Sequence, residues 1–168
     1  MEAARQADRA PGVVVRPALP GEATAVAEIW RDGWPDGHLG HVPDELVAVR
    51  DEASFRTRAV DRIGDITVAI VAGEVAGFVM RGGDEVEQVY VAARHRGMGV
   101  ADALMADAEG RIRDAGFGRA WLAVVAGNER ARRFYERRGW IDEGPVVYLA
   151  PGRDRPIEVP AHRYAKAL

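Results

Sequence analysis

Apolar residues recur along this chain with two different periods, which predicts an alternation of strands and helices. Short runs rich in β-branched residues at 13–15, 66–72 and 74–80 predict three strands. Gly73 lies between the last two runs and predicts a tight hairpin. The first third of the chain therefore contributes one isolated strand, and the hairpin follows after a longer connection.

That connection, between residues 22 and 61, predicts two helices. From Glu22 onward apolar residues recur at helical spacing, namely at Ala25, Val26, Ile29 and Trp30. We expect this helix to end before residues 33–43, which are too rich in glycine, proline and histidine to continue it. A second helix is expected over residues 54–61.

Residues 85–115 predict a strand that leads through a glycine-rich turn into an amphipathic helix. The strand covers residues 85–92, and it breaks at Arg94-His95-Arg96-Gly97-Met98-Gly99. The helix carries an apolar stripe and is expected to end near Gly116, which suits a helix C-terminus.

The last fifty residues predict a buried strand, a short helix and a final pair of strands. The apolar run at 119–125 indicates burial on both faces beside a parallel neighbour. Asn128 is a good N-cap for a short helix, and strands are expected over 140–149 and 157–167. One strand–helix–strand crossover in an otherwise antiparallel order predicts a mixed α/β sheet. We expect a single domain at 13–168 after a disordered leader at 1–12.

The glycine-rich turn is the clearest sign of chemistry. A helix N-terminus leaves backbone N–H groups unpaired and carries partial positive charge, so it suits a phosphate, and Arg94 and Arg96 stand just before it. A dinucleotide fingerprint would need a third glycine where Asp102 stands. A P-loop would need a Gly-Lys pair, and the only lysine is Lys166. Both of these nucleotide loops are excluded, which leaves another anion site or a simple turn.

Composition narrows the class of protein further. The chain has 168 residues, a net charge of −3 and a pI near 5.8, which argue against a general nucleic-acid binder. It has no cysteine, so disulfides, thiolate metal sites and a cysteine nucleophile are excluded. No apolar stretch is long enough for a membrane helix, and the first ten residues lack the apolar core of a signal peptide. We therefore expect a cytoplasmic protein with neither membrane nor nucleic-acid partners.

Two blocks of the sequence together resemble the GNAT (Gcn5-related) N-acetyltransferase family. Arg94–Gly99 matches the family's Q/R-x-x-G-x-G/A loop, and it follows the strand-like Val89-Tyr90-Val91. About thirty residues later, Asn128–Trp140 resembles the block Asn-x-x-Ala-x-x-Phe-Tyr-x-x-x-Gly-Phe, with tryptophan in place of the last phenylalanine. The resemblance covers about residues 13–149. It implies a GNAT fold, that is, a mixed, mostly antiparallel sheet of six to seven strands with two splayed central parallel strands, flanked by about four helices.

The resemblance also implies a donor site for acetyl-CoA and no metal. The pantetheine arm would pair with exposed backbone between the splayed strands, and the amides after the glycines would hold the pyrophosphate. Asn128 would contact the pantetheine, although a plain N-cap is the alternative. The implied donor-site residues are Val89, Tyr90, Val91, Arg94, Arg96, Gly97, Met98, Gly99, Val100, Ala101, Asn128, Arg132 and Arg133.

For the acyl transfer, the resemblance implies Tyr135 as the general acid that protonates the leaving thiolate. An ordinary phenol is protonated at neutral pH and can donate to sulfur. Strand alternation would place Glu85, Glu87, Val89 and Val91 on one face, so either carboxylate could accept the amine proton. We expect Glu87 to be the base and Glu85 the second candidate, with a solvated edge position as the alternative for each.

The resemblance also implies that the acceptor site lies in the family's variable segment, which here is residues 30–55. Trp30, Trp34, His38 and His41 are its candidate residues, and with Asp36 and Asp44 they offer aromatic surface and negative charge suited to an ammonium group. His38 and His41 lack a third ligand, so a metal is not expected. His95 is expected to be an exposed packing residue.

Three functions fit these observations. The first is N-acetylation of a small-molecule amine by acetyl-CoA. The others are a protein N-terminal or lysine acetyltransferase and a non-catalytic acyl-CoA sensor. The expected partners are an acyl-CoA donor and a small amine. The last two strands are common dimer surfaces in the family that the chain resembles, so a homodimer and a monomer are both left open.

Overall fold

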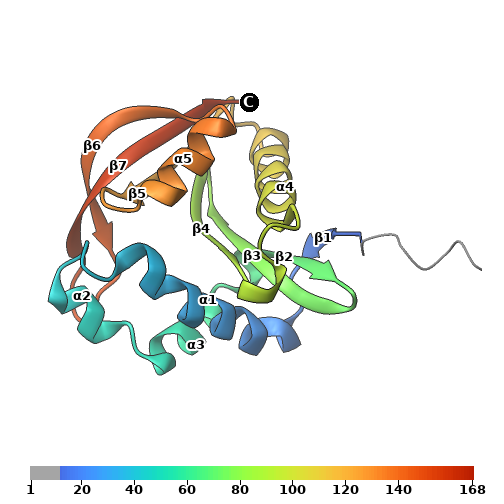
Figure 1. Cartoon of the computed structure of the whole chain (residues 1–168), viewed down its shortest axis with the longest axis horizontal. Helices are drawn as coiled ribbons and strands as arrows, with labels where there is room; N and C mark the ends of the chain where they lie inside the picture. Colours follow the sequence, from blue (N-terminus) through green and yellow to red (C-terminus); the bar gives the residue numbers. More distant parts are fainter. Residues whose placement is uncertain (1–11) are drawn as a thin grey trace, which may run out of the picture.

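Seven strands form one sheet in the order β1-β2-β3-β4-β5-β7-β6 (Figure 1). The computed structural model describes residues 12–168, so the expected leader lies almost wholly outside the described residues. All neighbouring strands are antiparallel except β4 and β5, which are parallel, and the predicted mixed sheet is confirmed. The strands are β1 (Val14–Pro17), β2 (Ile66–Val71), β3 (Glu74–Gly82), β4 (Glu85–Val91), β5 (Arg119–Val125), β6 (Ile141–Ala150) and β7 (Ile157–Ala167).

Helices cover both faces of the sheet, with α1 to α3 on one side and α4 and α5 on the other (Figure 1). The α-helices of the described residues are α1 (Ala23–His38), α2 (Asp44–Val49), α3 (Glu52–Asp61), α4 (Val100–Asp114) and α5 (Glu129–Arg137). Short 3-10 turns are present at Pro20–Glu22, Ile63–Asp65 and Ala93–His95. Two hydrophobic clusters result, one between the sheet and α1 to α3 and one between the sheet and α4.

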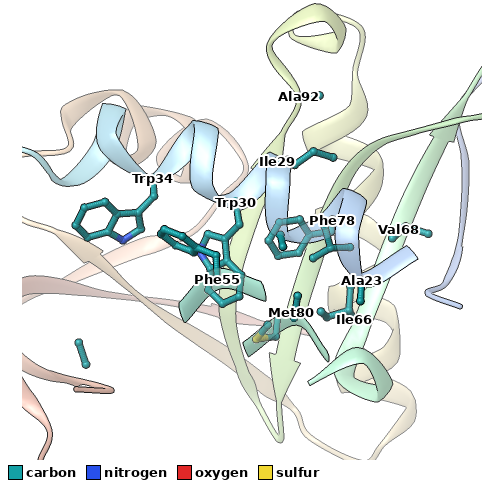
Figure 2. Packing of buried hydrophobic residues seen from close by; sticks show 14 of the residues in the cluster. Ala23, Ile29, Trp30, Trp34, Phe55, Ile66, Val68, Phe78, Met80 and Ala92 are labelled. Carbon is teal, nitrogen blue, oxygen red and sulfur yellow. The ribbon is translucent and has the colours of Figure 1, made fainter. Parts of the chain in front are cut away.

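Trp30 is the centre of the first cluster. Its side chain is fully buried, and its ring lies 5.5 Å from the ring of Phe55 on α3 and 5.7 Å from that of Phe78 on β3. Figure 2 shows these three rings between the helices and the sheet, with Trp34 further along the same helix. Helix α1 is therefore anchored to the sheet through aromatic contacts.

Helix α1 continues to His38, so the prediction that it ends before residue 33 is wrong. Two glycines in this last part allow close packing: a Cβ on Gly33 would lie 2.7 Å from the ring of Tyr90, and one on Gly37 would lie 2.6 Å from Nδ2 of Asn128. The buried side chain of Trp34 also holds this segment against the fold. Tertiary packing here outweighs the low helix propensity of glycine and proline.

Strands β4 and β5 are paired at only one position and then diverge. Their parallel register contains the single pair Glu85 and Trp121, whereas β5 pairs with β7 along its whole length. Only alternate residues of β5, such as Leu122 and Val124, are buried. The expectation that β5 is buried on both faces is therefore wrong, because the residues of its other face, Trp121, Ala123 and Val125, are only partly buried.

A β-bulge at Glu87 changes the direction of the side chains along β4. Met80 of β3 pairs with Gln88, but the next residue, Arg81, pairs with Val86, so Glu87 is the extra residue. Val89 and Val91 pack with the cluster under α4, and Tyr90 packs with the cluster under α1. The expectation that both glutamates share a face with Val89 and Val91 is therefore wrong, since the carboxylates contact residues on the α3 and β6 side.

Candidate active site

A cavity of about 580 Å³ occupies the gap between β4 and β5 and extends from the start of α4 to helices α1 to α3. It brings together most of the site residues expected from the sequence. The expected residues that line it are Trp34, His38, Glu85, Glu87, Val89, Tyr90, Val91, Arg96, Gly97, Gly99, Val100, Ala101, Asn128 and Tyr135.

The glycine turn has the geometry of an anion-binding helix N-terminus. Gly97 and Gly99 have φ angles of +76° and +77°, a region that residues with a Cβ rarely adopt, and Gly99 is the N-cap of α4. Within residues 12–168 the backbone N–H groups of Gly97, Met98 and Gly99 donate no hydrogen bond to backbone or side chain. The turn therefore offers a set of free donors at the positive end of a 15-residue helix.

The two arginines of this turn are engaged differently. Arg94 is exposed and donates to the Glu74 carboxylate at 3.0 and 3.1 Å, and it does not line the cavity. Arg96 lines the cavity, and its Nη2 lies 3.3 Å from a carboxylate oxygen of Asp36. His95 is only 8 % exposed, so the expectation of an exposed residue is wrong.

Asn128 serves as the N-cap of α5 and also lines the cavity. Its Oδ1 accepts a hydrogen bond from the backbone N–H of Ala131 at 3.2 Å, and its amide group contacts Gly37 of α1. The ring of His41 lies close against Gly127, next to Asn128. The end of α1 and the turn after it thus lie close against the β5–α5 loop.

The two expected donor-site arginines of α5, Arg132 and Arg133, make contacts within the protein. Arg132 bonds the Tyr164 hydroxyl, the carbonyl of Ala126 and the Asp142 carboxylate, each at 3.2 Å, and Arg133 pairs with Glu129 on the surface. Neither lines the cavity. Arg130, an exposed residue in the first turn of α5, does line it, and the sequence analysis did not single it out.

Tyr135 presents an unbonded hydroxyl to the cavity. Its ring packs edge-on against Phe134 and Trp140, with centroid distances of 5.2 and 6.2 Å. The hydroxyl makes no hydrogen bond within residues 12–168 and is not among the buried unsatisfied polar atoms, so it remains accessible. Burial of the side chain raises the pKa of Tyr135 to about 12, and the phenol is protonated throughout the physiological pH range.

The two glutamates of β4 have different partners. Both carboxylate oxygens of Glu87 accept from Arg62, at 2.8 and 2.9 Å. Oε1 of Glu85 accepts from the Tyr148 hydroxyl at 2.8 Å, and its other oxygen has no partner within the described residues. Burial raises the pKa of Glu85 above that of an ordinary carboxyl group.

Of the expected acceptor residues, Trp34 and His38 line the cavity, whereas Trp30 lies in the core and His41 is exposed at the β5–α5 loop. The ring of His38 stacks on Trp34 at 4.5 Å. Because the carbonyl of Trp34 can only accept, Nδ1 of His38 carries the proton of their 2.8 Å hydrogen bond and Nε2 is an acceptor. Burial lowers the pKa of His38 to about 4, so its imidazole is neutral at pH 7.

Of the two acidic residues expected at this wall, Asp36 lines the cavity and is paired with Arg96, whereas Asp44 is exposed on α2 and does not line it. The cavity is also lined there by Arg50 and Arg58, neither of which was predicted from the sequence. Helical spacing could have identified Arg58, because it lies three residues after the buried Phe55 in a predicted helix.

Comparison with known proteins agrees with the fold and the two motif blocks. The sequence profile of the acetyltransferase (GNAT) family matches residues 23–140. Uncharacterized N-acetyltransferases of Mycobacterium tuberculosis and Mycobacterium bovis are 32% identical over 113 residues, which cover 64% of this chain and 72% of each relative. The chain therefore belongs to the GNAT acetyltransferase family, a family of acyltransferases.

Solved structures share the fold at low sequence identity. A GCN5-related N-acetyltransferase from Rhodopseudomonas palustris has a TM-score of 0.73 at 21% identity, over 96% of this chain and 99% of that one. The PaiA N-acetyltransferase of Thermoplasma acidophilum, solved with coenzyme A, has a TM-score of 0.69 at 16% identity, over 94% and 99%. The yncA protein of Salmonella typhimurium, solved with acetyl-CoA, has a TM-score of 0.67 at 18% identity, over 94% of each chain.

Two further properties of the described residues bear on the class of site. None of the helices in residues 12–168 has the length and apolar character needed to cross a bilayer. The same residues contain no cluster of three or more histidine, aspartate or glutamate side chains arranged to hold a metal ion.

Proposed function

We propose that this protein transfers the acetyl group of acetyl-CoA to the primary amine of a small molecule, by direct attack in a ternary complex. The observation that carries the proposal is the single cavity that joins the glycine turn, the gap between β4 and β5, and the free hydroxyl of Tyr135. The solved relatives that bind coenzyme A or acetyl-CoA support the choice of donor.

The donor would lie on the α4 side of the gap. Its pyrophosphate would accept hydrogen bonds from the backbone amides of residues 97–101, with Arg96 and Arg130 supplying positive charge nearby. Its pantetheine arm would pair as an extra strand with the backbone of residues 89–91, because β5 has already separated from β4 there. Asn128 is the other proposed contact of the arm.

The chemistry would proceed from a neutral amine. Its nitrogen attacks the thioester carbonyl carbon, the proton leaves the nitrogen for a base, and the carbon–sulfur bond breaks as Tyr135 donates a proton to the sulfur. Glu85 is a better candidate for the base than Glu87, because Arg62 occupies both oxygens of Glu87. The free oxygen of Glu85 could accept the proton directly or through a water molecule.

A small acceptor fits the covered cavity better than a polypeptide does. The end of α1 reaches across to the β5–α5 loop through the contacts of Gly37 with Asn128 and of His41 with Gly127. A peptide substrate needs an open groove at this place.

The direct test is thiol release from acetyl-CoA with panels of small amines and of short peptides. We expect saturable release with at least one class of small amine and none above background with peptides. Tight binding of acetyl-CoA by calorimetry without release on any amine would indicate a non-catalytic sensor. Preferential turnover of peptides would indicate a protein acetyltransferase.

The role of Glu85 can be tested through the pH dependence of kcat/KM. At pH values below the pKa of a carboxylate that must be ionised, the slope of log kcat/KM against pH increases by one. Since burial raises the pKa of Glu85, this steepening should begin above the usual carboxyl range, and Glu85→Gln should remove it. We also expect that substitution to lower kcat/KM at neutral pH by roughly 100-fold.

Glu87→Gln is the matched control, because it removes a neighbouring carboxylate of the same strand. We expect this variant to keep the additional slope. If the slope instead disappears in Glu87→Gln and persists in Glu85→Gln, Glu87 is the base.

A further inference from the structure

Two arginines line the α1–α3 end of the cavity without an ionic partner. Arg50 is the C-cap of α2 and Arg58 lies in α3. Within residues 12–168 neither forms an ion pair, whereas Arg62, one helical turn after Arg58, is paired with both Asp65 and Glu87. Arg50 and Arg58 therefore place two cations without a carboxylate partner at this end of the cavity.

Each of the two guanidinium groups is held in place by a contact with a group other than a carboxylate. Nη2 of Arg50 donates to the carbonyl of Pro151 at 2.7 Å. The guanidinium carbon of Arg58 lies 4.3 Å above the centre of the Trp30 ring, a cation–π contact with a fully buried tryptophan. A carbonyl and an aromatic ring orient a cation but do not neutralise it.

The two positive charges also affect each other. Burial lowers the pKa of both arginines, and the positive charge of Arg50 lowers the pKa of Arg58 further, to about 10. Both remain cationic at pH 7. Two like charges in a partly desolvated cavity repel each other, and binding an anion between them lowers this electrostatic free energy. This end of the cavity therefore favours a negatively charged group.

The opposite charge in the same part of the cavity is carried by Glu85. The Tyr148 hydroxyl donates to Glu85 at 2.8 Å, and burial together with this hydrogen bond raises the pKa of Tyr148. Glu85, Tyr148 and Arg58 all line this cavity. The same cavity is also lined by the apolar side chains of Trp34, Leu46 and Val159.

From this arrangement we propose, on the basis of the acetyl transfer proposed above, that the acceptor is an amino acid-like molecule whose carboxylate binds between Arg50 and Arg58. Its amine then lies toward Glu85 and the thioester, and its side chain contacts the apolar part of the wall. Carboxylates are held well by guanidinium groups, which present paired N–H donors in a fixed plane.

Matched acceptors test the carboxylate requirement. Leucine, leucinamide and isoamylamine share an alkyl chain, and phenylalanine, phenylalaninamide and phenethylamine share an aromatic one. We expect kcat/KM to be at least tenfold higher for the carboxylate in each set. Equal or higher values for the amides or the simple amines would overturn the proposal. A preference for aminoethylphosphonate over β-alanine would overturn the proposal that the arginines bind a carboxylate, and it would indicate that they bind a phosphoryl group instead.

Variants test the two arginines. Arg58→Gln and Arg50→Gln should each raise KM for the preferred amino acid at least tenfold, while KM for its amide and for acetyl-CoA changes less than twofold. Arg56→Gln is the matched control, since Arg56 is exposed on the same helix and pairs only with Glu52, and it should change neither value. Equal losses with the amino acid and its amide would contradict the proposal. Arg50→Gln keeps the test valid should Arg58→Gln loosen the packing around Trp30.

A binding measurement separates this inference from the acetyl transfer itself. N-acetylleucine and N-acetylphenylalanine are titrated by calorimetry into the protein in the presence of coenzyme A. Binding that weakens at least tenfold in Arg50→Gln, with or without turnover of any amine, supports the anion site. Absence of binding to the wild-type protein, together with turnover of uncharged amines, overturns it while leaving the acetyl transfer intact.

Discussion

Replacing Tyr135 by phenylalanine is expected to lower kcat by about 100-fold, within the range that general acids contribute. The substitution removes only a hydroxyl that makes no hydrogen bond within residues 12–168 and leaves the ring packed against Phe134 and Trp140. The dissociation constant of acetyl-CoA and the melting temperature should therefore change little. Stopped assays of thiol release at saturating substrates measure the effect.

The pH dependence makes this prediction sharper. A phenol with a pKa of about 12 is a weaker acid than a thiol, whose ordinary pKa is about 8.5. Complete proton transfer before the carbon–sulfur bond breaks is therefore unfavourable, and we expect Tyr135 to donate as charge develops on the sulfur. Because Tyr135 stays protonated, the ratio of wild-type to variant kcat should be constant between roughly pH 6 and pH 10.

Tyr164→Phe is the matched control for Tyr135→Phe. The ring of Tyr164 lies 6.3 Å from that of Tyr135, but its hydroxyl bonds Arg132 and Glu136 and does not line the cavity. This variant should lose some stability and retain kcat. A Tyr135→Phe enzyme with full kcat would remove that hydroxyl from the mechanism.

Replacing Trp30 by alanine should have the largest effect on stability. Its fully buried ring contacts Phe55 and Phe78 and supports Arg58, so the cavity left behind should lower the free energy of unfolding by about 3–5 kcal/mol. For a chain of this length, that corresponds to a fall in Tm of roughly 6–20 °C. Calorimetric or circular dichroism melts would measure it.

Phe117→Ala provides the comparison, because Phe117 is 40% exposed and its truncation should change the free energy of unfolding by less than about 1 kcal/mol. Trp30→Phe retains part of the aromatic packing and should have an intermediate Tm. A Tm of Trp30→Ala within 2 °C of the wild-type value would contradict the central position of this residue in the core.

The sequence was most informative where structure is determined locally. The positive φ angles of Gly97 and Gly99 and the cap at Asn128 follow from short motifs, because only a few residue types suit those backbone positions. The positions of the strands along the chain could be predicted for the same reason, from β-branched runs and the turns between them.

Features that depend on contacts between residues far apart in the chain could not be predicted from short sequence motifs. The second half of α1 is stabilised by the fit of Gly33 against Tyr90 and of Gly37 against Asn128, and these contacts join residues that are far apart in the chain. The environment of Arg50 likewise depends on Pro151, one hundred and one residues away. The acidic residues of the first loop suggested a cationic acceptor, but in the fold the unpaired arginines face the cavity.

The bulge at Glu87 divides the cavity-lining side chains of β4 between the two faces of the sheet. Glu85 and Glu87 turn their carboxylates toward the α1–α3 side, whereas Val89 and Val91, after the bulge, pack on the α4 side, where the glycine turn lies. Under the proposed function, selection could therefore alter the residues that would choose an acceptor, in α2, α3 and β6, without disturbing those that would hold the donor. Such independence would let relatives diverge in substrate while keeping one shared reaction, and it would make Arg50, Arg58 and Tyr148 the natural positions for redesigning acceptor choice.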